Sequence, residues 1–371
     1  MRTVIVSHTY ADPANRGKLR ALAGQGCVLA VAVPDRWTPP GRLEPLTTTY
    51  GDDAGVRITP IAVRGIDRHG APARWKASAL RRLISDFRPD IVHVEEEPGT
   101  AVAAAVAGMA RKLGVRCSLL TWESVPQEHS FAERLRRNRT FARLDGVVGG
   151  SALAAGLATR HRPGLPSAAI PQLGVRVPLS PPEETHKSLA IGFIGRLVPE
   201  KGFDILLRAS VRLFGTWSIT VVGTGPAQEE LEALAEKLGV AARIHWMGAL
   251  PRRELANIWP RLDCLVAPSR TAARWVETYP VPVLEAMAHG VAVVASDSGA
   301  LPEVVGTAGL VVPEDNPDAL TEVLARLGRE EEIRRQLGAE GRRRVIEEYV
   351  DDAVARKTLQ FWRALADRPA T

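Results

Sequence analysis

Short apolar runs alternate with helical patterns along almost the whole chain, and this alternation limits the possible folds more than any other feature. Each run has the length of a strand and is bounded by turn residues. The stretch between two runs is long enough for a helical crossover. Such βαβ units build parallel sheets that helices cover on both faces. The sequence therefore predicts a doubly wound α/β architecture.

The alternation gives the positions of the main elements. The expected strands are Thr3–Val6, Val28–Ala32, Ile58–Val63, Ile91–Val94, Cys117–Thr121, Gly146–Gly149, Leu189–Ile194, Ser218–Val222, Ile244–Met247, Cys264–Ala267, Ala292–Ser296 and Leu310–Val312. The expected helices are Arg16–Gly24, Trp75–Phe87, Ala101–Leu113, Ala132–Leu144, Phe203–Arg212, Gln228–Leu238, Arg252–Trp259 and Pro282–His289, followed by three helical stretches.

Two domains are expected, because 371 residues exceed the roughly 250–300 over which one core keeps growing. The proline-rich segment His161–Pro182 and the polar run Pro182–Lys187 interrupt the alternation and indicate a linker. We expect an N-terminal acceptor-side domain over 1–175 and a C-terminal nucleotide-sugar-binding domain over 176–351. A helix at about 352–371 is expected to pack back on the first domain. Two Rossmann-like domains would then face a central cleft.

Composition excludes several classes of protein. Cys27, Cys117 and Cys264 stand singly in apolar runs, which is typical of buried thiols and not of disulfides or metal ligands. The start of the sequence has no charged-then-apolar leader, and no apolar stretch is long enough to span a bilayer. These features predict a cytoplasmic protein.

The charge is uneven along the chain. Residues 1–177 carry 25 Lys and Arg against 15 Asp and Glu, whereas the remainder is acidic. The basic half is the one expected to meet an anionic partner. Nucleic acid is not expected, because the basic helices lack interleaved aromatics and any known module. Peripheral contact with anionic lipid on the inner face of the membrane is the hypothesis we retain, against the simpler interpretation of solvated basic faces.

Two glycine-containing turns follow strands in the second half. Gly195 and Arg196 end one strand, and Lys201 stands five residues later at a helix start. An anion held there would meet backbone N–H groups, the positive helix end and two cations, although cations at such places are often only solvated. Gly223 and Gly225 form the next such turn, which is either part of a nucleotide pocket or only a tight connection.

Two glutamates stand in a Glu-x7-Glu segment that starts in a proline-rich loop and becomes a helix. Glu285 lies in an apolar helical turn, where an unpaired carboxylate is costly to bury. A ribose diol would satisfy Glu285, and so would an arginine. Glu277 stands in the loop before the helix and could reach a sugar. Trp246 and Met247, which end another strand, could contact a base or simply pack.

These motifs together resemble the donor domain of glycosyltransferase family 4. The resemblance covers residues 189–350 densely, through the glycine turns, the Glu-x7-Glu segment and Val293–Glu303, and the first half more thinly. It implies a GT-B fold, a nucleotide-sugar donor, and transfer to an acceptor hydroxyl with retention at the anomeric carbon. It also implies no metal and no resident cofactor. The acceptor would be a sugar, a lipid-linked molecule or a small molecule.

The resemblance also implies roles for individual residues. Arg196 and Lys201 would bind and neutralise the leaving diphosphate, Glu285 the ribose, and Glu277 the donor sugar. The donor-binding set that we expect is Gly195, Arg196, Lys201, Gly223, Gly225, Trp246, Met247, Glu277, Tyr279, Val281 and Glu285.

The chain departs from the family at three places. Thr278, Tyr279 and Pro280 stand where relatives have Gly-Phe-Gly, so some backbone phosphate contacts are missing. The acceptor-side loop lacks a Gly-Gly pair, and its candidate residues are His8, Tyr10, Asn15 and Arg16. Glu97, in the acidic cluster at the end of another strand, is a further acceptor-side candidate. Glu123 occupies the position of a histidine that faces the reaction centre in relatives, and it is the candidate to position or deprotonate the acceptor hydroxyl.

Two other functions remain open from the sequence. A nucleotide-sugar epimerase of the same fold would use the same nucleotide site with a different acid/base set. A non-catalytic binding protein on this fold would have lost Arg196, Lys201 or Glu285, and all three are present.

Overall fold

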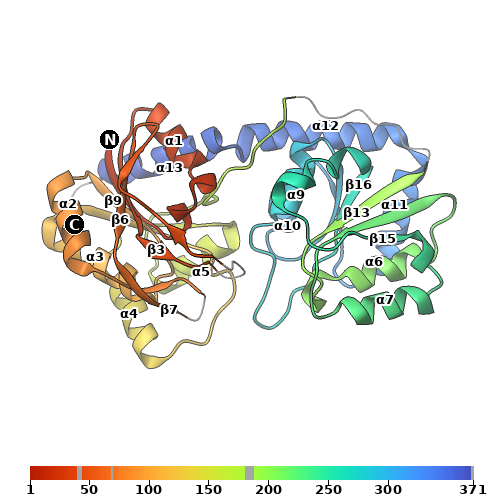
Figure 1. Cartoon of the computed structure of the whole chain (residues 1–371), viewed down its shortest axis with the longest axis horizontal. Helices are drawn as coiled ribbons and strands as arrows, with labels where there is room; N and C mark the ends of the chain where they lie inside the picture. The colour runs from red at the N-terminus through yellow and green to blue at the C-terminus, as the bar shows by residue number, and fades with distance from the viewer. Residues whose placement is uncertain (40–43, 68–69, 180–187, 369–371) are drawn as a thin grey trace. The chain divides into compact units, whose positions relative to one another are not determined.

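The computed structural model describes residues 1–39, 44–67, 70–179 and 188–368. The chain forms two compact units (Figure 1). The N-terminal unit comprises Met1–Gly174 and the segment from Asp351 onward, and the C-terminal unit comprises Val175–Val350. The run Pro182–Lys187 of the expected linker lies outside the described residues.

The N-terminal unit is built on an eight-stranded sheet in the order β12-β11-β10-β9-β1-β2-β6-β5. Its strands are β1 (Arg2–Val6), β2 (Val28–Pro34), β5 (Gly51–Asp53), β6 (Val56–Ile61), β9 (Ile91–Glu95), β10 (Arg116–Thr121), β11 (Gly146–Gly149) and β12 (Ser167–Ala169). All neighbours are parallel except β5 and β6. Two short antiparallel ribbons pair β3 (Arg36–Trp37) with β4 (Leu46–Thr47) and β7 (Val63–Ile66) with β8 (Pro72–Trp75).

Helices cover both faces of this sheet. They are α1 (Gly17–Gly24), α2 (Ala77–Phe87), α3 (Ala101–Leu113), α4 (Phe131–Phe141), α5 (Ala152–His161) and α13 (Asp351–Ala366). One core cluster packs α2 and α3 on the sheet. The other packs α1 and α13 on the opposite face, where Trp362 of α13 is fully buried. The short turns η1 (Thr9–Ala11) and η2 (Pro13–Asn15) lead from β1 to α1.

The C-terminal unit has a six-stranded, entirely parallel sheet in the order β15-β14-β13-β16-β17-β18. The strands are β13 (Leu189–Ile194), β14 (Trp217–Val222), β15 (Ile244–Trp246), β16 (Cys264–Ala267), β17 (Ala292–Ser296) and β18 (Leu310–Val312). The order runs outward from β13 in one direction and from β16 in the other. The connections after these two neighbours therefore leave in opposite directions and open a crevice at their carboxyl ends, the place where such sheets bind ligands.

The helices of the C-terminal unit are α6 (Phe203–Ser210), α7 (Gln228–Lys237), α8 (Arg252–Leu255), α9 (Val281–Ala288), α10 (Leu301–Val305), α11 (Pro317–Arg329) and α12 (Glu331–Glu348), with the turns η3 (Pro199–Lys201), η4 (Ala241–Arg243) and η5 (Trp259–Arg261). One core cluster packs α6, α7 and α11 on the sheet, and another packs α9, α10 and α12 on the opposite face (Figure 1). The doubly wound α/β prediction is confirmed.

Local sequence explains where several helices begin. Ser130 and Glu133 form a capping box at the start of α4, and Thr100 and Ser151 accept the cap hydrogen bonds of α3 and α5. Gly114 ends α3 in the left-handed conformation, with φ of 66°. These caps satisfy backbone N–H and C=O groups that a helix end leaves unpaired.

The sequence missed or misplaced some elements. The expected helix Trp75–Phe87 begins only at Ala77, because Trp75 ends the strand β8. The expected helix Arg252–Trp259 is four residues of α8 followed by η5, where Pro260 has no N–H to continue a helix. The strand β12 lies inside the segment that we expected to be linker. The three cysteines are free and buried, as predicted.

Candidate active site

The loop after β13 lies at the crevice of the C-terminal unit and carries both predicted phosphate-binding cations. Gly195 N–H donates to Val222 O at 2.9 Å, which ties this loop to the end of β14. Lys201 ends η3 and is half-buried, whereas Arg196 is exposed. Within the described part of the chain, no hydrogen bond or ion pair engages the Arg196 guanidinium. It is therefore available to a ligand.

The glycines of the two turns allow the loops after β13 and β14 to touch. Gly223 has φ of 137°, and a Cβ on it would lie 1.8 Å from Gly195 O. A Cβ on Gly225 would lie 2.2 Å from Leu197 O. The glycines thus serve the packing of one loop on the other, since no larger residue fits there.

Lys201 and Glu277 meet at the crevice although 76 residues separate them. The Lys201 ammonium forms an ion pair with Glu277 Oε2, and Ser269 Oγ donates to the same oxygen at 3.2 Å. Glu277 is only 7% exposed. Its backbone is fixed as well, because Ala300 N–H donates to Glu277 O at 2.7 Å. A cation expected to hold a diphosphate and a carboxylate expected to hold a sugar therefore lie side by side.

Glu285 lies on α9, whose start is in the same loop system. It is 8% exposed, which confirms the predicted burial. The His289 ring nitrogen Nδ1 lies 2.8 Å from the backbone carbonyl of Glu285 and closes the helix end. Tyr279 and Val281, the remaining candidates of this segment, are half-buried before and at the first residue of α9.

The predicted base-binding residues lie at the end of β15. Trp246 packs edge-on against Phe203, with ring centroids 5.4 Å apart, so part of its indole belongs to the core. Met247 is 42% exposed, and its N–H donates to Val221 O at 2.9 Å. Of the two, Met247 offers the more accessible surface to a base.

Three residues near the crevice escaped the sequence analysis: Ser269, Arg270 and Trp275. They follow β16 in the segment Pro268–Val276, which leads to Glu277. The signal that could have found them is their position, since the loop after a strand at the switch point faces the ligand site.

In the N-terminal unit, the acceptor-side candidates lie after β1 and β9, the neighbours from which that sheet runs outward. The His8 ring lies 2.7 Å from Glu96 Oε1, and although burial lowers the pKa of His8, Glu96 raises it above its usual value. The Asn15 amide donates to Thr9 O at 3.0 Å. Of the candidates that follow β1, the half-buried His8 and Asn15 keep some exposure to solvent.

The side chains of Tyr10 and Arg16 form hydrogen bonds inside this unit. Tyr10 is fully buried, and its hydroxyl donates to Glu95 Oε1 at 3.1 Å. The Arg16 guanidinium donates to Tyr10 O at 2.8 Å and pairs with Asp53 at 3.1 Å. Both side chains have their polar groups occupied by the protein, so neither is available to an acceptor.

A buried ion pair underlies this region. Lys18 Nζ lies 2.5 Å from Glu95 Oε1, and both side chains are at most 1% exposed. Burial alone would raise the pKa of Glu95, but Lys18 and His93 lower it to about 2. Gln172 bridges Glu95 to the Trp122 indole at 2.9 and 3.0 Å. These buried hydrogen bonds fix the ends of the loops that carry the acceptor-side candidates.

Glu97 lies beside the end of β10, in surroundings that favour its protonated form. Thr121 Oγ1 and Trp122 N–H lie 2.5 and 2.9 Å from its two carboxyl oxygens. Burial raises the pKa of Glu97 to about 7 despite these bonds, and the nearby negative charge of Glu123 adds to the rise. The residue as a whole is half-buried, but its carboxyl group is enclosed.

The structure gives Glu123 partners that the sequence did not predict. Its carboxylate forms an ion pair with Arg137 of α4, and the His129 ring nitrogen Nε2 lies 3.0 Å from its other oxygen. Arg137 also lies 2.6 Å from the His161 ring. Because both oxygens of Glu123 are engaged, the geometry favours an ordering role over the role of a base.

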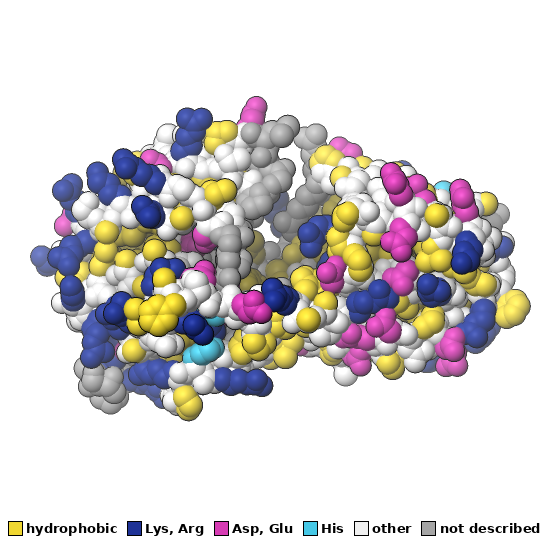
Figure 2. Space-filling view, turned by 90° about the horizontal axis from the view of Figure 1, so that it is seen from below, with side chains coloured by type: hydrophobic (Ala, Val, Ile, Leu, Met, Phe, Trp, Pro, Cys, Tyr) yellow, Lys and Arg dark blue, Asp and Glu magenta, His cyan; other side chains and the backbone are white. Residues whose placement is uncertain are grey.

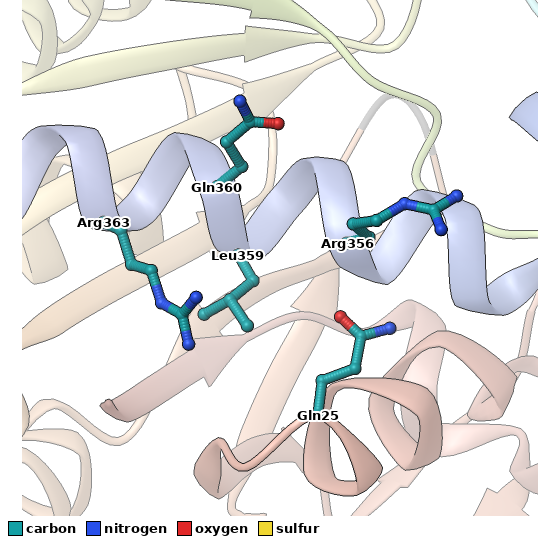
Figure 3. Close-up of a pocket in the computed structure, with 5 residues that line it drawn as sticks. All are labelled: Gln25, Arg356, Leu359, Gln360 and Arg363. Carbon is teal, nitrogen blue, oxygen red and sulfur yellow. The ribbon is translucent and has the colours of Figure 1, made fainter.

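One pocket lies at the opposite end of the N-terminal sheet. Figure 3 shows this groove between α1 and α13, with a volume of about 510 Å³. Its lining residues are Gln25, Arg356, Leu359, Gln360 and Arg363. Gln25 precedes β2, so the groove lies at the amino edge of the parallel strands and is separate from the candidate site. Among the described residues, no group of three His, Cys, Asp or Glu side chains is arranged to hold a metal ion.

The fold and the crevice define a class of protein. Two doubly wound parallel units form the GT-B fold, and solved structures with this fold match almost the whole chain. Sucrose-phosphate synthase from Thermosynechococcus elongatus aligns with a TM-score of 0.71 at 18% identity, covering 98% of this chain and 99% of that one. The Anabaena protein HepE in complex with UDP aligns with a TM-score of 0.71 at 14% identity, covering 98% of this chain and 100% of that one.

Two family models match the chain, one in each half. "Glycosyl transferase 4-like domain" matches residues 13–171 and "Glycosyl transferases group 1" matches residues 180–344. The chain belongs to glycosyltransferase family 4.

Among curated proteins, the chain is 35% identical over 205 residues to an MMP alpha-(1->4)-mannosyltransferase of Mycolicibacterium hassiacum, covering 53% of this chain and 48% of that protein. It is 30% identical over 248 residues to a GDP-mannose-dependent monoacylated alpha-(1-6)-phosphatidylinositol monomannoside mannosyltransferase of Corynebacterium glutamicum, covering 64% of this chain and 60% of that protein. The chain thus spans about half the length of the curated relatives it matches. Both relatives are named as sugar transferases, which gives the epimerase alternative no support.

Proposed function

We propose that this protein transfers a sugar from a nucleotide-sugar donor to an acceptor hydroxyl with retention of the anomeric configuration. The observation that carries the proposal is the pairing of Lys201 with Glu277 at the switch point of the C-terminal sheet. This pair places a cation suited to a diphosphate next to a carboxylate suited to sugar hydroxyls.

The leaving diphosphate gains negative charge as the glycosidic bond breaks. Arg196 is free to approach it from the exposed side of the loop, and Lys201 from the crevice. Cations fixed before the reaction stabilise such developing charge without reorganisation, and they supply the electrostatics that a divalent ion would otherwise bring. The Glu285 carboxylate accepts hydrogen bonds from the ribose hydroxyls, and Met247 and Trp246 lie against the base.

The donor sugar lies against Glu277 in this proposal. Lys201 and Ser269 hold the Glu277 carboxylate in one orientation, so it can accept hydrogen bonds from sugar hydroxyls. In the N-terminal unit, His8 and Asn15 are the acceptor-side candidates, while Glu123 orders Arg137 and His129. Glu97, whose two carboxyl oxygens are engaged by Thr121 and Trp122, orders the end of β10.

The names of the relatives guide the choice of substrates. Several are named as GDP-mannose-dependent enzymes acting on phosphatidylinositol monomannoside. We therefore propose GDP-mannose as the first donor to test and a lipid-linked sugar or polyol as the first acceptor.

A lipid-linked acceptor agrees with the surface of α4. Phe131 and Leu135 are 75% and 39% exposed one turn apart, and the exposed Arg134 and Arg139 flank them. Lys and Arg side chains gather on the N-terminal unit, which is at the left of Figure 2. Apolar side chains among cations suit the surface of an anionic bilayer. In the part of the chain that the structure describes, no helix has the length and apolar character to cross a membrane.

Vesicle co-sedimentation tests this contact. We expect binding to vesicles that contain phosphatidylglycerol at low salt, release at high salt, and loss of binding in the double variant Phe131→Ser, Leu135→Ser. Absence of binding to anionic vesicles at low salt would reject the membrane contact.

A donor panel tests the proposed function itself. Thermal unfolding is measured with GDP, UDP, ADP and dTDP, because a ligand at a hundredfold excess over Kd stabilises the native state by about 2.7 kcal/mol. We expect a clear shift with at least one of the four, and no shift with any of them would remove the basis of the proposal. With the matching sugar donor and an acceptor, the product's anomeric configuration follows from its NMR coupling constants. Inversion would contradict retention.

A further inference from the structure

In the segment between β16 and Glu277, Arg270 forms hydrogen bonds with the turn η3, with Asp204 and with Asp315. Arg270 N–H donates to Glu200 O at 2.9 Å, and its guanidinium donates to Pro199 O at 3.2 Å. The same guanidinium bonds to Asp204 at 3.1 Å and to Asp315 at 2.7 Å. Glu200 and Pro199 belong to η3, the turn that ends in Lys201. Arg270 therefore fixes the position of the segment relative to the backbone that carries this lysine.

The next residues close a tight turn. Thr271 bonds to Glu314 through both its N–H, at 2.6 Å, and its hydroxyl, at 2.5 Å, and its hydroxyl lies 3.2 Å from Ser298 Oγ. Ala272 and Trp275 then exchange backbone hydrogen bonds of 2.8 and 3.2 Å. The hydrogen bonds of Arg270 and Thr271, together with the turn from Ala272 to Trp275, fix the backbone of Trp275. Its indole therefore has a defined position.

That place is against the Lys201 ammonium. Lys201 Nζ lies 5.1 Å from the centroid of the Trp275 ring, while the same ammonium forms its ion pair with Glu277. An aromatic face attracts a cation through its quadrupole, most strongly for tryptophan. A lysine side chain has four flexible carbons, and fixing it before a ligand arrives lowers the entropy lost on binding. The ring and the carboxylate together leave the ammonium a narrow range of positions.

We propose that Trp275 is a positioning residue of the donor site, whose indole face holds the Lys201 ammonium where the donor diphosphate binds. This inference rests on the proposed function of the site. It predicts that a bound diphosphate brings its negative charge next to the ammonium that the ring holds, so the environment of the indole changes on binding. It also predicts that an aromatic replacement keeps most of the effect, whereas an aliphatic one loses it.

The test compares four proteins: the wild type, Trp275→Phe, Trp275→Leu and the control Trp217→Phe. Trp217 also stacks on a cation, with Arg243 4.7 Å from its ring centroid, but it opens β14 at the amino edge of the same sheet. Each protein is titrated with GDP and UDP. Binding is measured by calorimetry and tryptophan emission is recorded in parallel, with circular dichroism as the check that each variant is folded.

We expect Trp275→Leu to raise the Kd of the nucleoside diphosphate about tenfold and Trp275→Phe to raise it less than about threefold, because phenylalanine keeps a weaker aromatic face. The emission change that accompanies binding should be smaller in both Trp275 variants than in the wild type, with the remainder coming from Trp246 beside the base, and it should be unchanged in Trp217→Phe. Binding by the wild type with an unchanged Kd in Trp275→Leu, or an emission change as large in the Trp275 variants as in the wild type, would overturn the inference. If Trp275→Leu does not fold, the emission of Trp275→Phe decides. A wild type that binds none of the diphosphates would instead overturn the proposed function.

Discussion

The ion pair between Lys201 and Glu277 can be tested by a double-mutant cycle. The changes are Lys201→Met, Glu277→Gln and both together, which keep the approximate shape of each side chain while removing its charge. The side chains of Lys201 and Glu277 are 21% and 9% exposed, so the pair is screened far less than a surface pair. Removal of the lysine leaves a largely buried carboxylate with Ser269 as its remaining hydrogen-bond donor.

The expected coupling follows from charge and burial. Two unit charges 4 Å apart attract by about 4 kcal/mol at an effective dielectric constant of about 20. Desolvation of both groups offsets part of this attraction, and we expect a coupling free energy of about 2 kcal/mol. Lys201→Met alone should destabilise the C-terminal unit by about 3 kcal/mol, since it leaves the buried charge unpaired. The double variant should be less destabilised than the sum of the single ones.

Scanning calorimetry is the appropriate assay because it separates the unfolding transitions of two units. The matched control is the cycle Arg212→Met, Asp318→Asn, whose ion pair in the same unit is 58% and 72% exposed. Such a surface pair is expected to couple by about 0.5 kcal/mol or less. A Lys201–Glu277 coupling no larger than that of the control would refute the pairing.

Three further predictions concern binding, pH and packing. Glu285→Gln should weaken nucleoside diphosphate binding about tenfold through the lost charged hydrogen bonds, whereas Glu277→Gln should slow turnover with less effect on that Kd; equal loss of binding in both would contradict the assigned roles. Because the pKa of Glu97 is raised to about 7 in the folded protein and is about 4 in an unfolded chain, stability should fall as the pH rises between these values. The Glu97→Gln variant should lose about 3 kcal/mol of this dependence in unfolding measured from pH 4.5 to 8, and parallel curves would show that Glu97 ionises normally. Gly223→Ala should lower the melting temperature of the C-terminal unit more than Gly215→Ala, since its Cβ meets a backbone oxygen at 1.8 Å whereas nothing lies within 4 Å of the Cβ at Gly215; equal shifts would contradict the loop packing.

Much of the fold could be predicted because its signals are local. Most strands of the two main sheets are apolar runs such as Ile91–Val94 and Ala292–Ser296, and the chain alternates them with helices that show their own caps. The edge strands β5 and β12 escaped prediction because each has only three residues and neither is an apolar run. The helix expected from Trp75 was misplaced because a tryptophan fits a strand end as well as a helix start.

Contacts between distant residues of the site could not be predicted. The sequence separates Lys201 from Glu277 by 76 positions and Glu123 from Arg137 by 14, and nothing in either segment states that these side chains meet. The burial of Glu285 was predictable, since its neighbours on every side of the helical turn are apolar. The position of Trp275 could not be predicted, because it depends on Arg270, whose hydrogen bonds tie this segment to a different loop.

The packing of α13 on α1 has a consequence for synthesis. Residues 175–350 form a continuous unit that can fold as soon as it has left the ribosome, whereas the N-terminal unit, although made first, needs residues made after all of them. Until Leu359 and Trp362 arrive, one face of its sheet, with Leu19 and Leu22 of α1, lacks the part of its apolar cover that α13 supplies. The N-terminal unit therefore cannot complete its fold while the second half is being translated. During that time its apolar surface is exposed, and a chaperone would bind it most readily.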